Sequence, residues 1–563
     1  MKLAGVPTPT VARWWPIARS TWKADILAGL TLWGLVVPES VAYSSLAGAP
    51  PSSGIWAVVL ILPTYALFGW SRHLVATPTS AAAVTMGGIV SSLSHYPAMK
   101  AVGAVTLAVG VVFLIAHLFR LGFLVHFISE PINAGFMVGL AIFITISQLS
   151  KVLGIDGGHG NALRRLGTIA AHLGKINWFT VLIAAFCLGV LLVLPKVAPK
   201  APAGLIMVAV AAAIVAVFQL DSKHHVATPG AIPTGLPGVT VPNLAAADWG
   251  MVIAGAVGLV LLAYSEASTV ARDIADKQGY VYPSNRDLFP FGLGNVVGGF
   301  FGTLIGAGSM SSTSTNVRAG AQTPISTLTT AAAALITALF LGGIFASLPE
   351  AALGVLIIHA VARHITFRFY GKIVRYSPAE ASIAVVAALG VLIFDVLWGL
   401  VIAMVLSLMW FMHRTTSSVC WRVGQATDRP GLLVREGMDT YAALPANVLG
   451  LRFGGQIFYG NVDGVVGTIE GYLSERAPAG HAGRFDLVVL DMEGQSVLDY
   501  TTGMRLVSLG TSLASRGLTL ALVGVRGDGV GEMLDQLSGP DDHLVMQRST
   551  DLSELLKKHP LPL

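Results

Sequence analysis

Two carboxylates inside apolar runs are the first candidates for chemistry. Glu39 follows Pro38 in an apolar run that extends to Tyr43, and Glu266 closes the run from Leu259 to Ser265. An acid within a membrane span is energetically expensive and is a functional candidate by default. Proline also frees helix backbone groups, which the protein interior or a ligand must then satisfy. Each carboxylate is therefore a candidate ligand or proton site, and the alternative for each is a structural carboxylate satisfied by its neighbours.

The elements that position these acids must lie in a membrane. Only 12% of the 563 residues are charged, about half the share of a soluble protein. Residues 1–413 hold 22 Lys and Arg and 13 Asp and Glu, whereas residues 414–563 hold 13 and 17. This predicts an apolar body in the lipid bilayer followed by one soluble domain. The pI near 9.1 reflects basic residues beside the membrane, and we expect no nucleic-acid partner.

The apolar body divides into about 14 spans when each takes about 20 residues. The expected helices are 26–45, 54–70, 79–94, 101–119, 131–150, 177–195, 201–219, 248–268, 288–303, 313–323, 326–346, 350–362, 379–395 and 396–413. The first 24 residues lack the features of a cleavable signal, so we expect the first span to be retained. Lys and Arg concentrate in alternate connections, which predicts a multi-pass protein of the cell membrane with a cytoplasmic N-terminus.

One connection opposes this charge rule. Residues 151–176 are expected on the outer side, yet they contain Lys151, Arg164, Arg165 and Lys175. The charge rule offers no explanation for this cluster beyond its weakness for late loops.

Two of the expected spans are short and interrupted in the same way. The segment 79–94 follows the polar stretch 75–80, the segment 313–323 follows 306–312, and each is third in a set of seven. Such a pair points to the binding site of a transporter with inverted repeats. Non-helical backbone at membrane depth must then line a cavity or be buried in protein. The alternative is two ordinary helices that begin with Ser or Thr caps.

Metal, redox and hydrolytic chemistry have little support in the sequence. The two cysteines, Cys187 and Cys420, form neither a disulfide framework nor a CxxC site. The pair His224 and His225 lies in a Pro/Gly-rich stretch without further ligand spacing, so we read it as loop. No nucleophile and base are brought together by any motif. We expect no metal, no cofactor and no enzyme activity.

The C-terminal region alternates between strand and helix patterns. We expect strands at 448–453, 487–492 and 518–525 and amphipathic helices at 462–475 and 503–515. This order predicts a small α/β domain. Thr501 and Thr502 precede or begin the second helix, where helix capping is the simpler role and phosphorylation the alternative.

Several motifs together resemble the sulfate permease (SulP) family of anion transporters. They include Val37-Pro38-Glu39-Ser40-Val41-Ala42-Tyr43-Ser44, Leu46-Ala47-Gly48-Ala49-Pro50-Pro51, Ser71-Arg72-His73-Leu74 and Thr313-Ser314-Thr315-Asn316-Val317-Arg318. Phe458-Tyr459-Gly460-Asn461 and Asp499-Tyr500-Thr501-Thr502-Gly503 resemble the STAS domain that follows such transporters. The motifs occur in the family's order and cover essentially the whole chain.

The resemblance implies an α-helical membrane protein with two inverted seven-span repeats, a core domain, a gate domain and a cytoplasmic α/β STAS-like domain. It also implies a homodimer with cytoplasmic termini. The expected boundaries are a cytoplasmic segment at 1–24, a transporter domain at 25–413 with repeats of about 25–219 and 248–413, a linker at 414–440 and the STAS-like domain at 441–563. We expect the STAS-like domain to regulate or dimerise.

The resemblance also implies an anion site between the N-termini of the third and tenth helices, with help from the first and eighth. Carried over to this chain, the site residues are Glu39, Tyr43, Thr79, Ser80, Ala81, Glu266, Ser311, Ser312 and Thr313. Two helix N-termini, each with about half a unit charge, attract a monoanion by about 3 kcal/mol at roughly 5 Å and an effective dielectric of about 20.

Two departures from the family change the expected chemistry. Many relatives have Gln where Glu39 stands and Arg where Ser312 stands, so a fixed cation is lost and an acid gained. An ionised Glu39 about 5 Å from the anion would cost roughly 3 kcal/mol, or about two decades of affinity. A protonated Glu39 avoids this repulsion and can donate a hydrogen bond. Our hypothesis is that Glu39 couples proton entry to anion entry, and the rival is an ionised Glu39 that binds sodium beside Glu266.

The function predicted from the sequence is secondary active anion transport by proton symport with an elevator-like motion. Sulfate is the family default, and bicarbonate or carboxylates are the alternatives, because a site without the fixed Arg holds a hydrated dianion less well. Two other classes remain open. One is an uncoupled anion channel, and the other is an anion sensor that signals through the STAS-like domain.

Overall fold

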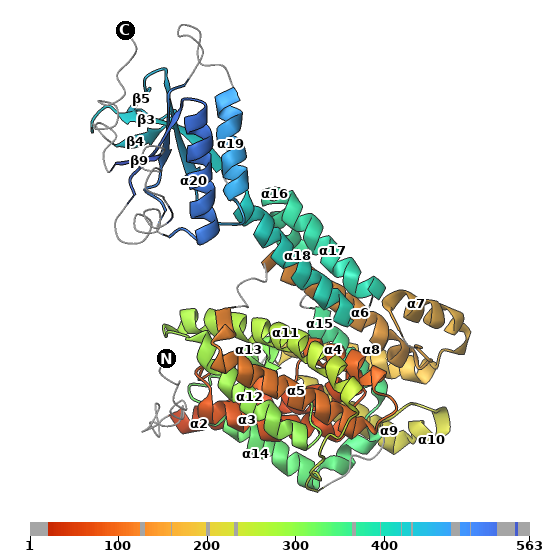
Figure 1. The fold of residues 1–563 in the computed structure, drawn as a ribbon. Helices are drawn as coiled ribbons and strands as arrows, with labels where there is room; N and C mark the ends of the chain where they lie inside the picture. The colour runs from red at the N-terminus through yellow and green to blue at the C-terminus, as the bar shows by residue number, and fades with distance from the viewer. Residues whose placement is uncertain are drawn as a thin grey trace. The chain divides into compact units, whose positions relative to one another are not determined.

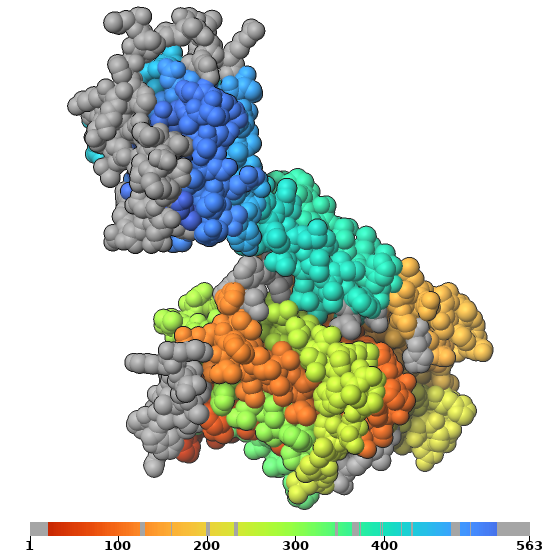
Figure 2. All heavy atoms as spheres, viewed as in Figure 1, coloured from red at the N-terminus to blue at the C-terminus, as the bar shows by residue number. Residues whose placement is uncertain are grey.

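The computed structural model describes residues 21–549, except 124–129, 159, 199–202, 230–234, 363–366, 395, 418, 430–431, 475–484, 496, 526–536 and 538–545. The chain forms two compact units, Met1–Leu408 and Met409–Leu563, drawn as a ribbon in Figure 1 and with all heavy atoms in Figure 2. The first is the membrane unit and the second the C-terminal unit.

The first half of the membrane unit is helical apart from one short strand. Its elements are α2 (Trp22–Leu46), α3 (Pro51–Phe68), β1 (Ala76–Thr77), α4 (Ser80–Ser92), α5 (Ala98–Leu118), α6 (Glu130–Leu153), α7 (Ala162–Ala171), η3 (Leu173–Lys175), α8 (Trp178–Val197), α9 (Ala203–Phe218) and α10 (Leu220–His224). α2 remains helical through Pro38, and α4 is short, as the sequence predicts.

The second half repeats the pattern of long helices around one short strand. Its elements are α11 (Ala246–Gln278), α12 (Ser284–Phe300), β2 (Ala307–Gly308), α13 (Met310–Arg318), α14 (Ile325–Phe340), η4 (Gly342–Ser347), α15 (Glu350–Ala362), α16 (Phe367–Tyr376), α17 (Pro378–Phe394) and α18 (Val396–Thr416). In the described residues, seven helices are long and apolar enough to cross a membrane, and five shorter apolar helices accompany them. The count of 14 spans stays a prediction.

Most helix bounds lie within a few residues of those expected, with three differences. α13 begins at Met310 and ends at Arg318 instead of spanning 313–323. α11 continues to Gln278, ten residues beyond its expected end, because Arg272, Asp273 and Asp276 extend the helix as a polar segment. α7, α10 and α16 are short helices in connections for which no helix was expected. Hydrophobic periodicity alone does not reveal such ends.

The helices of the membrane unit pack in two groups. α2, α3, α4 and α5 contact α11, α12, α13 and α14, and we call these the first helix group. α6, α8 and α9 contact α15, and α6 also contacts α17, which makes the second helix group. α5 and α12 approach each other closely, because a Cβ on Gly103 would lie 2.6 Å from the Gly299 carbonyl oxygen. Small residues permit this contact between backbones, as expected for membrane helices.

The C-terminal unit is a mixed sheet with helices. Its elements are β3 (Val419–Ala426), β4 (Leu433–Arg435), β5 (Tyr441–Ala442), β6 (Val448–Gly454), α19 (Val462–Ser474), β7 (Leu487–Asp491), α20 (Tyr500–Ser515), β8 (Thr519–Val523) and β9 (Met546–Ser549). The strand order is β4-β3-β6-β7-β8-β9, with β5 beside β3. β6 to β9 are parallel and β3 is antiparallel to β6.

The expected strands and helices of this unit are present at nearly the expected positions. The stretch 414–440 differs, because it was expected to be a linker but carries β3 and β4 of the sheet. Four residues of β3, from Val419 to Arg422, pair with β6. The polar composition of this stretch hid the strands, because only one face of an antiparallel edge needs to be apolar.

Candidate functional site

The two short strands of the membrane unit are buried and pair with each other. β1 and β2 pair antiparallel, with Ala76 opposite Gly308 and Thr77 opposite Ala307. This pairing satisfies backbone groups of both non-helical stretches, which bilayer lipid would leave without partners. α4 and α13 begin two or three residues after the strands, so the strand pair brings the N-termini of these two helices together.

Both helices have side-chain caps, which the sequence held open as the simpler interpretation. Thr79 Oγ1 accepts the Ala82 N–H of α4 at 3.3 Å, and Ser309 Oγ accepts the Ser312 N–H of α13 at 3.3 Å. Thr79 and Ser309 therefore hold equivalent positions in the two halves. Sequence reasoning missed Ser309 because it started the tenth helix at residue 313. The signal was a serine three residues before another polar residue, the N-cap pattern.

Glu266 lies next to the α4 cap. Its carboxyl interacts with the Thr79 side chain, while its buried Oε2 has no hydrogen-bond partner among the residues that the structure describes. The close packing of β2 on α11 sets this position, because a Cβ on Gly308 would be 2.6 Å from Ala267 Cα, one residue along from Glu266. The expected proximity of the eighth helix to the short helices is thus present in the structure.

Glu39 lines a cavity with the first turn of α13. The cavity has a volume of about 810 Å³ and lies between α2 and α13 on one side and α8, α9 and α15 on the other. Glu39 is 6% exposed. The polar wall residues are Thr31, Glu39, Ser311, Thr315, Arg318 and His359. This cavity lies at the seam between the two helix groups, and we call it the Glu39 cavity.

Arg318 supplies a cation that sequence reasoning missed. Ser311, Thr315 and Arg318 all line the Glu39 cavity, and their spacing of four and three residues places them on one face of α13. Arg318 Nη2 donates a weak hydrogen bond to Thr315 Oγ1 at 3.4 Å. If this helix had been predicted to begin at Met310, the helical spacing from Ser311 would have predicted that Arg318 lies on the same face.

The remaining site candidates divide into buried structural groups and helix-start positions. Thr313 Oγ1 accepts the Val75 N–H at 3.0 Å and is fully buried, so it joins α13 to the stretch before β1. Ser312 Oγ accepts a hydrogen bond from Ser309 Oγ at 3.1 Å. Ser80 and Ala81 are the first two residues of α4, whose N–H groups precede the first helical hydrogen bond.

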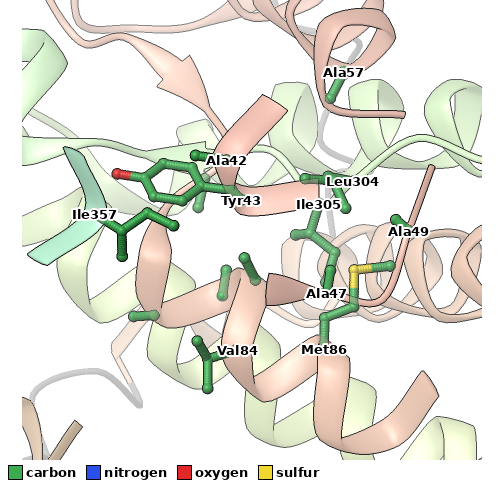
Figure 3. Close-up of a cluster of buried hydrophobic side chains, with 14 of the residues drawn as sticks. Ala42, Tyr43, Ala47, Ala49, Ala57, Val84, Met86, Leu304, Ile305 and Ile357 are labelled. Carbon is green, nitrogen blue, oxygen red and sulfur yellow. The ribbon is translucent and has the colours of Figure 1, made fainter. Parts of the chain in front are cut away.

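Tyr43 is buried in the apolar core of the membrane unit. It is 4% exposed and belongs to the same cluster as Ile305 and Ile357. Figure 3 shows Tyr43 of α2 among side chains of this cluster, with Ile357 on α15. Tyr43 is not among the residues that line the Glu39 cavity, although it follows Glu39 by four residues on α2.

The two threonines of the C-terminal unit have different environments. Asp499 caps α20, accepting the Thr502 N–H at 3.0 Å and the Thr502 hydroxyl at 2.7 Å. Thr502 is fully buried, whereas Thr501 is exposed. The helix cap is therefore Asp499. Thr502 is its buried hydrogen-bond partner, whereas the exposed Thr501 is accessible to a modifying enzyme.

With the geometry established, comparison with known proteins decides the family. The model of the Sulfate permease family matches residues 22–414, which include the whole Glu39 cavity. The chain belongs to this family. It is therefore an anion transporter of the membrane and not an enzyme.

Relatives extend the similarity of this sulfate permease family member along the full chain. It is 28% identical over 562 residues to a probable sulfate transporter of Mycobacterium tuberculosis, covering 97% of this chain and 98% of the relative. It is 26% identical over 521 residues to the chloroplastic sulfate transporter 4.1 of Arabidopsis thaliana, covering 89% and 75% of the two chains.

Solved structures show the same fold. The murine Slc26a9 anion transporter in its inward-facing state superposes with a TM-score of 0.87 at 20% identity, over 98% of this chain and 94% of that one. The transmembrane domain of the cyanobacterial bicarbonate transporter BicA gives a TM-score of 0.61 at 22% identity, over 69% of this chain and 98% of that one. The full-length match includes the C-terminal sheet, as expected for a STAS-like domain.

Proposed function

We propose that this protein is a proton-coupled symporter that moves an inorganic anion through the Glu39 cavity. The observation that carries the proposal is that Glu39, Ser311 and Arg318 line one cavity. An acid, a helix N-terminus and a cation then act on the same bound ion. Glu39, Tyr43, Thr79, Ser80, Ala81, Glu266, Ser311, Ser312 and Thr313 remain the proposed substrate-site residues, and the geometry above adds Ser309 and Arg318.

Anion binding would rest on the helix starts and on Arg318. The first N–H groups of α4 and α13 have no partner within their helices, and each helix end carries about half a positive charge. Arg318 adds a positive charge to the cavity wall, in a chain where the family's Arg is replaced by Ser312. The Ser311 hydroxyl, on the cavity wall, is available to replace water around the anion.

Glu39 would link the anion to a proton. An ionised Glu39 repels the anion, and protonation removes a repulsion worth roughly 3 kcal/mol at about 5 Å and an effective dielectric near 20. Proton and anion then enter together, because each improves the binding of the other. Glu266, joined to the α4 cap through Thr79, is the second acid of the site. Sodium bound at the two acids is the competing arrangement.

Sulfate is the proposed default substrate. The curated relatives reported above are sulfate transporters by name, and they match nearly the full chain. Bicarbonate and small carboxylates are the alternatives, supported by the fold shared with a bicarbonate transporter and by the presence of an acid in the cavity.

An elevator-like motion of the first helix group past the second would carry the site across the membrane. The Glu39 cavity lies on the seam between these groups, and the antiparallel β1–β2 pair relates two halves with matching caps. This is the arrangement expected of inverted repeats, with the first group as core and the second as gate. We further propose a homodimer with cytoplasmic termini, the domain boundaries given above, and a regulatory or dimerising role for the C-terminal unit.

Uptake into proteoliposomes tests this proposal. Purified protein is assayed with labelled sulfate, bicarbonate, fumarate and chloride, with and without an inward proton gradient. We expect one anion to accumulate only with the gradient. Glu39→Gln should retain anion exchange but lose the effect of the proton gradient. Glu266→Gln removes the second acid and provides the comparison.

Each other outcome selects a different function. Accumulation driven by sodium and abolished in Glu39→Gln would replace the proton by sodium. Passive currents without accumulation would indicate a channel. Anion binding without flux would indicate a sensor that acts through the C-terminal unit. Unchanged proton coupling in Glu39→Gln would show that Glu39 is not the coupling residue.

A further inference from the structure

A second cavity lies at the opposite end of α2. It has a volume of about 590 Å³, and its wall includes Ser45 and Leu46, whereas the Glu39 cavity begins at Leu27 and Thr31. Ser45 is 18 positions after Leu27, a rise of about 27 Å along the helix, close to the thickness of a bilayer core. The two cavities therefore lie toward opposite faces of the membrane unit. We call the second one the Arg165 cavity.

The Arg165 cavity joins the second half of α4 to α6 and to the loop before α7. The wall residues from α4 begin at Val84, four residues after the helix start, and those from α6 end at Lys151. The cavity therefore contacts α4 after its first turn, and the proposed function places the transported anion at the start of that helix. The edge of the cavity at Val84 lies about one helical turn along α4 from that helix start.

Two cations line this cavity and no carboxylate of the described residues does. The cations are Lys151 and Arg165. Arg165 Nε donates to the Gly160 carbonyl at 2.9 Å, and its guanidinium lies 5.6 Å from the Phe143 ring centroid, so the charge is held at the wall. These residues belong to the connection whose positive charges oppose the orientation rule. A role in binding anions gives that exception a physical reason.

Lys151 is held by contacts that an anion can replace. Its Nζ donates to Ser45 Oγ and lies 3.6 Å from Glu350 Oε2, with side-chain exposures of 23% for Lys151 and 33% for Glu350. A partly exposed ion pair of this kind is weak. The contact with Ser45 also joins α6 of the second helix group to α2 of the first.

The same wall holds an unpaired polar group. Gln148 is 2% exposed, and its Oε1 has no partner in the described structure, while its Nε2 donates to Ser147 Oγ at 3.2 Å. Oε1 can accept a hydrogen bond but cannot donate one, so it suits a water molecule that accompanies an ion. Ser147 and Ser150 contribute further hydroxyls to the wall. Cations together with acceptors suit an anion that retains part of its hydration shell.

We propose that Lys151 and Arg165 form a staging site, that is, a site where a hydrated inorganic anion binds before it reaches the transport site. It lies on the opposite side of the helix starts from the Glu39 cavity. The site rests on the proposed function in one respect, namely that the staged ion is the transported one. Cations in a low-dielectric cleft raise the local concentration of anions and speed their entry. The site therefore determines how readily an anion arrives from that face and leaves the transport step itself unchanged.

Binding and transport of labelled sulfate test this site separately. Equilibrium binding is measured on the purified full-length protein at about 10 mM and about 500 mM ionic strength, where the Debye lengths are about 30 Å and 4 Å. We expect the double variant Lys151→Gln/Arg165→Gln to weaken low-salt binding about fivefold and to approach wild type at high salt. In uptake assays, the single variant Arg165→Gln, which leaves the contact of Lys151 with Ser45 in place, should raise KM for entry from that face while kcat is unchanged.

Arg164 provides the matched control. It precedes Arg165 on α7, is exposed and does not line the cavity. Arg164→Gln changes the net charge as Arg165→Gln does and should leave binding and KM near wild type. Arg165→Lys should retain most of the effect, since the charge is kept. Thermal unfolding of each variant separates these effects from loss of fold.

The outcomes distinguish this inference from the proposed function. Equal changes in the Arg164 and Arg165 variants would show that only general surface charge acts and would overturn the staging site. Normal proton-driven uptake with unchanged KM in the Arg165→Gln variant would overturn the staging site and leave the proposed function intact. Salt-dependent sulfate binding that requires Lys151 and Arg165, in a protein that moves no anion, would support the site and overturn the function.

Discussion

Gly308 of β2 lies directly against Ala267 of α11, so that a Cβ at position 308 would stand 2.6 Å from both Cα and Cβ of Ala267. This contact helps to hold together the strand pair, Glu266 and the starts of α4 and α13. Only a residue without a side chain fits there, because the opposing atoms include rigid backbone.

Gly308→Ala should therefore destabilise the protein and impair transport. The added methyl group must displace α11 or β2, and overpacking of this kind costs about 1–3 kcal/mol. The expected results are a lower Tm in a thermal unfolding assay and a reduced uptake rate. Gly250→Ala, near the start of the same helix, is the control, because a Cβ there meets nothing within 4 Å. Equal behaviour of the two variants would contradict the proposed packing constraint.

Removing either helix cap should weaken anion binding. Thr79→Ala and Ser309→Ala each delete the side-chain oxygen that orders a helix start, at a cost of about 1 kcal/mol. We expect KM to rise in both variants and to recover in Thr79→Ser. Asn177→Ala removes the cap of α8, where Asn177 Oδ1 accepts from Phe179 and Thr180. This control should lose comparable stability with KM unchanged. A similar KM rise in Asn177→Ala would mean that the caps act only through stability.

Arg318 should contribute charge to the Glu39 cavity. We expect Arg318→Gln to raise KM for the anion about threefold to tenfold, as for one charge several Å away across a partly hydrated cavity. Arg318→Lys keeps the charge and should stay close to wild type. Initial uptake rates over a range of anion concentrations measure both. Equal KM values in wild type and Arg318→Gln would remove Arg318 from the site.

The adjacent threonines of α20 should respond differently to the same substitution. Thr502→Val leaves a buried position without the hydroxyl that bonds Asp499 at 2.7 Å, and the expected loss is about 1 kcal/mol. Thr501→Val changes an exposed side chain and should have little effect. Hydrogen exchange of peptides covering 499–516 reports the local stability of α20. If a kinase acts here, mass spectrometry should find phosphate on Thr501 and not on Thr502, and the reverse would contradict this assignment.

Asp499 should make the stability of α20 dependent on pH. Burial alone would raise the pKa of its carboxyl, but hydrogen bonds from the Thr502 side chain and from backbone N–H groups hold the pKa below its usual value. A carboxyl with a lowered pKa stabilises the folded state above its unfolded pKa, and this is lost as pH falls through the folded pKa. Asp499→Ala should therefore be less stable than wild type at neutral pH, and the difference should shrink below about pH 4. A difference independent of pH in hydrogen exchange would contradict this.

Much of the architecture could be predicted from local patterns. The apolar runs gave the long helices of the membrane unit, and the polar stretches 75–80 and 306–312 marked the two short ones. Alternation in the last third predicted the α/β unit. These features depend on the period and length of hydrophobic segments, which neighbouring residues report directly. The start of α13 was misplaced by three residues because its first turn is polar and carries no periodic signal.

The site was only partly predictable. Glu39 and Glu266 were predicted from the cost of an acid in an apolar run, and the start of α4 from its short, interrupted segment and from the family resemblance. Three features were not predicted. Arg318 and Glu39 line one cavity, Thr313 binds the Val75 N–H, and Tyr43 is buried without lining that cavity. Each of these depends on a side chain's neighbours across helices.

By itself, the sequence predicted a membrane body followed by an α/β domain, two short interrupted segments within that body, and acids within its spans. These properties follow from local hydrophobicity and from the high cost of charge in lipid. Only the tertiary structure decided which of these groups share a cavity. It paired β1 with β2 across more than 200 residues and gathered Lys151 and Arg165 at a second cavity. A sequence pattern shows which segments will be buried. Which of these distant segments contact each other depends on how closely their side chains pack in three dimensions.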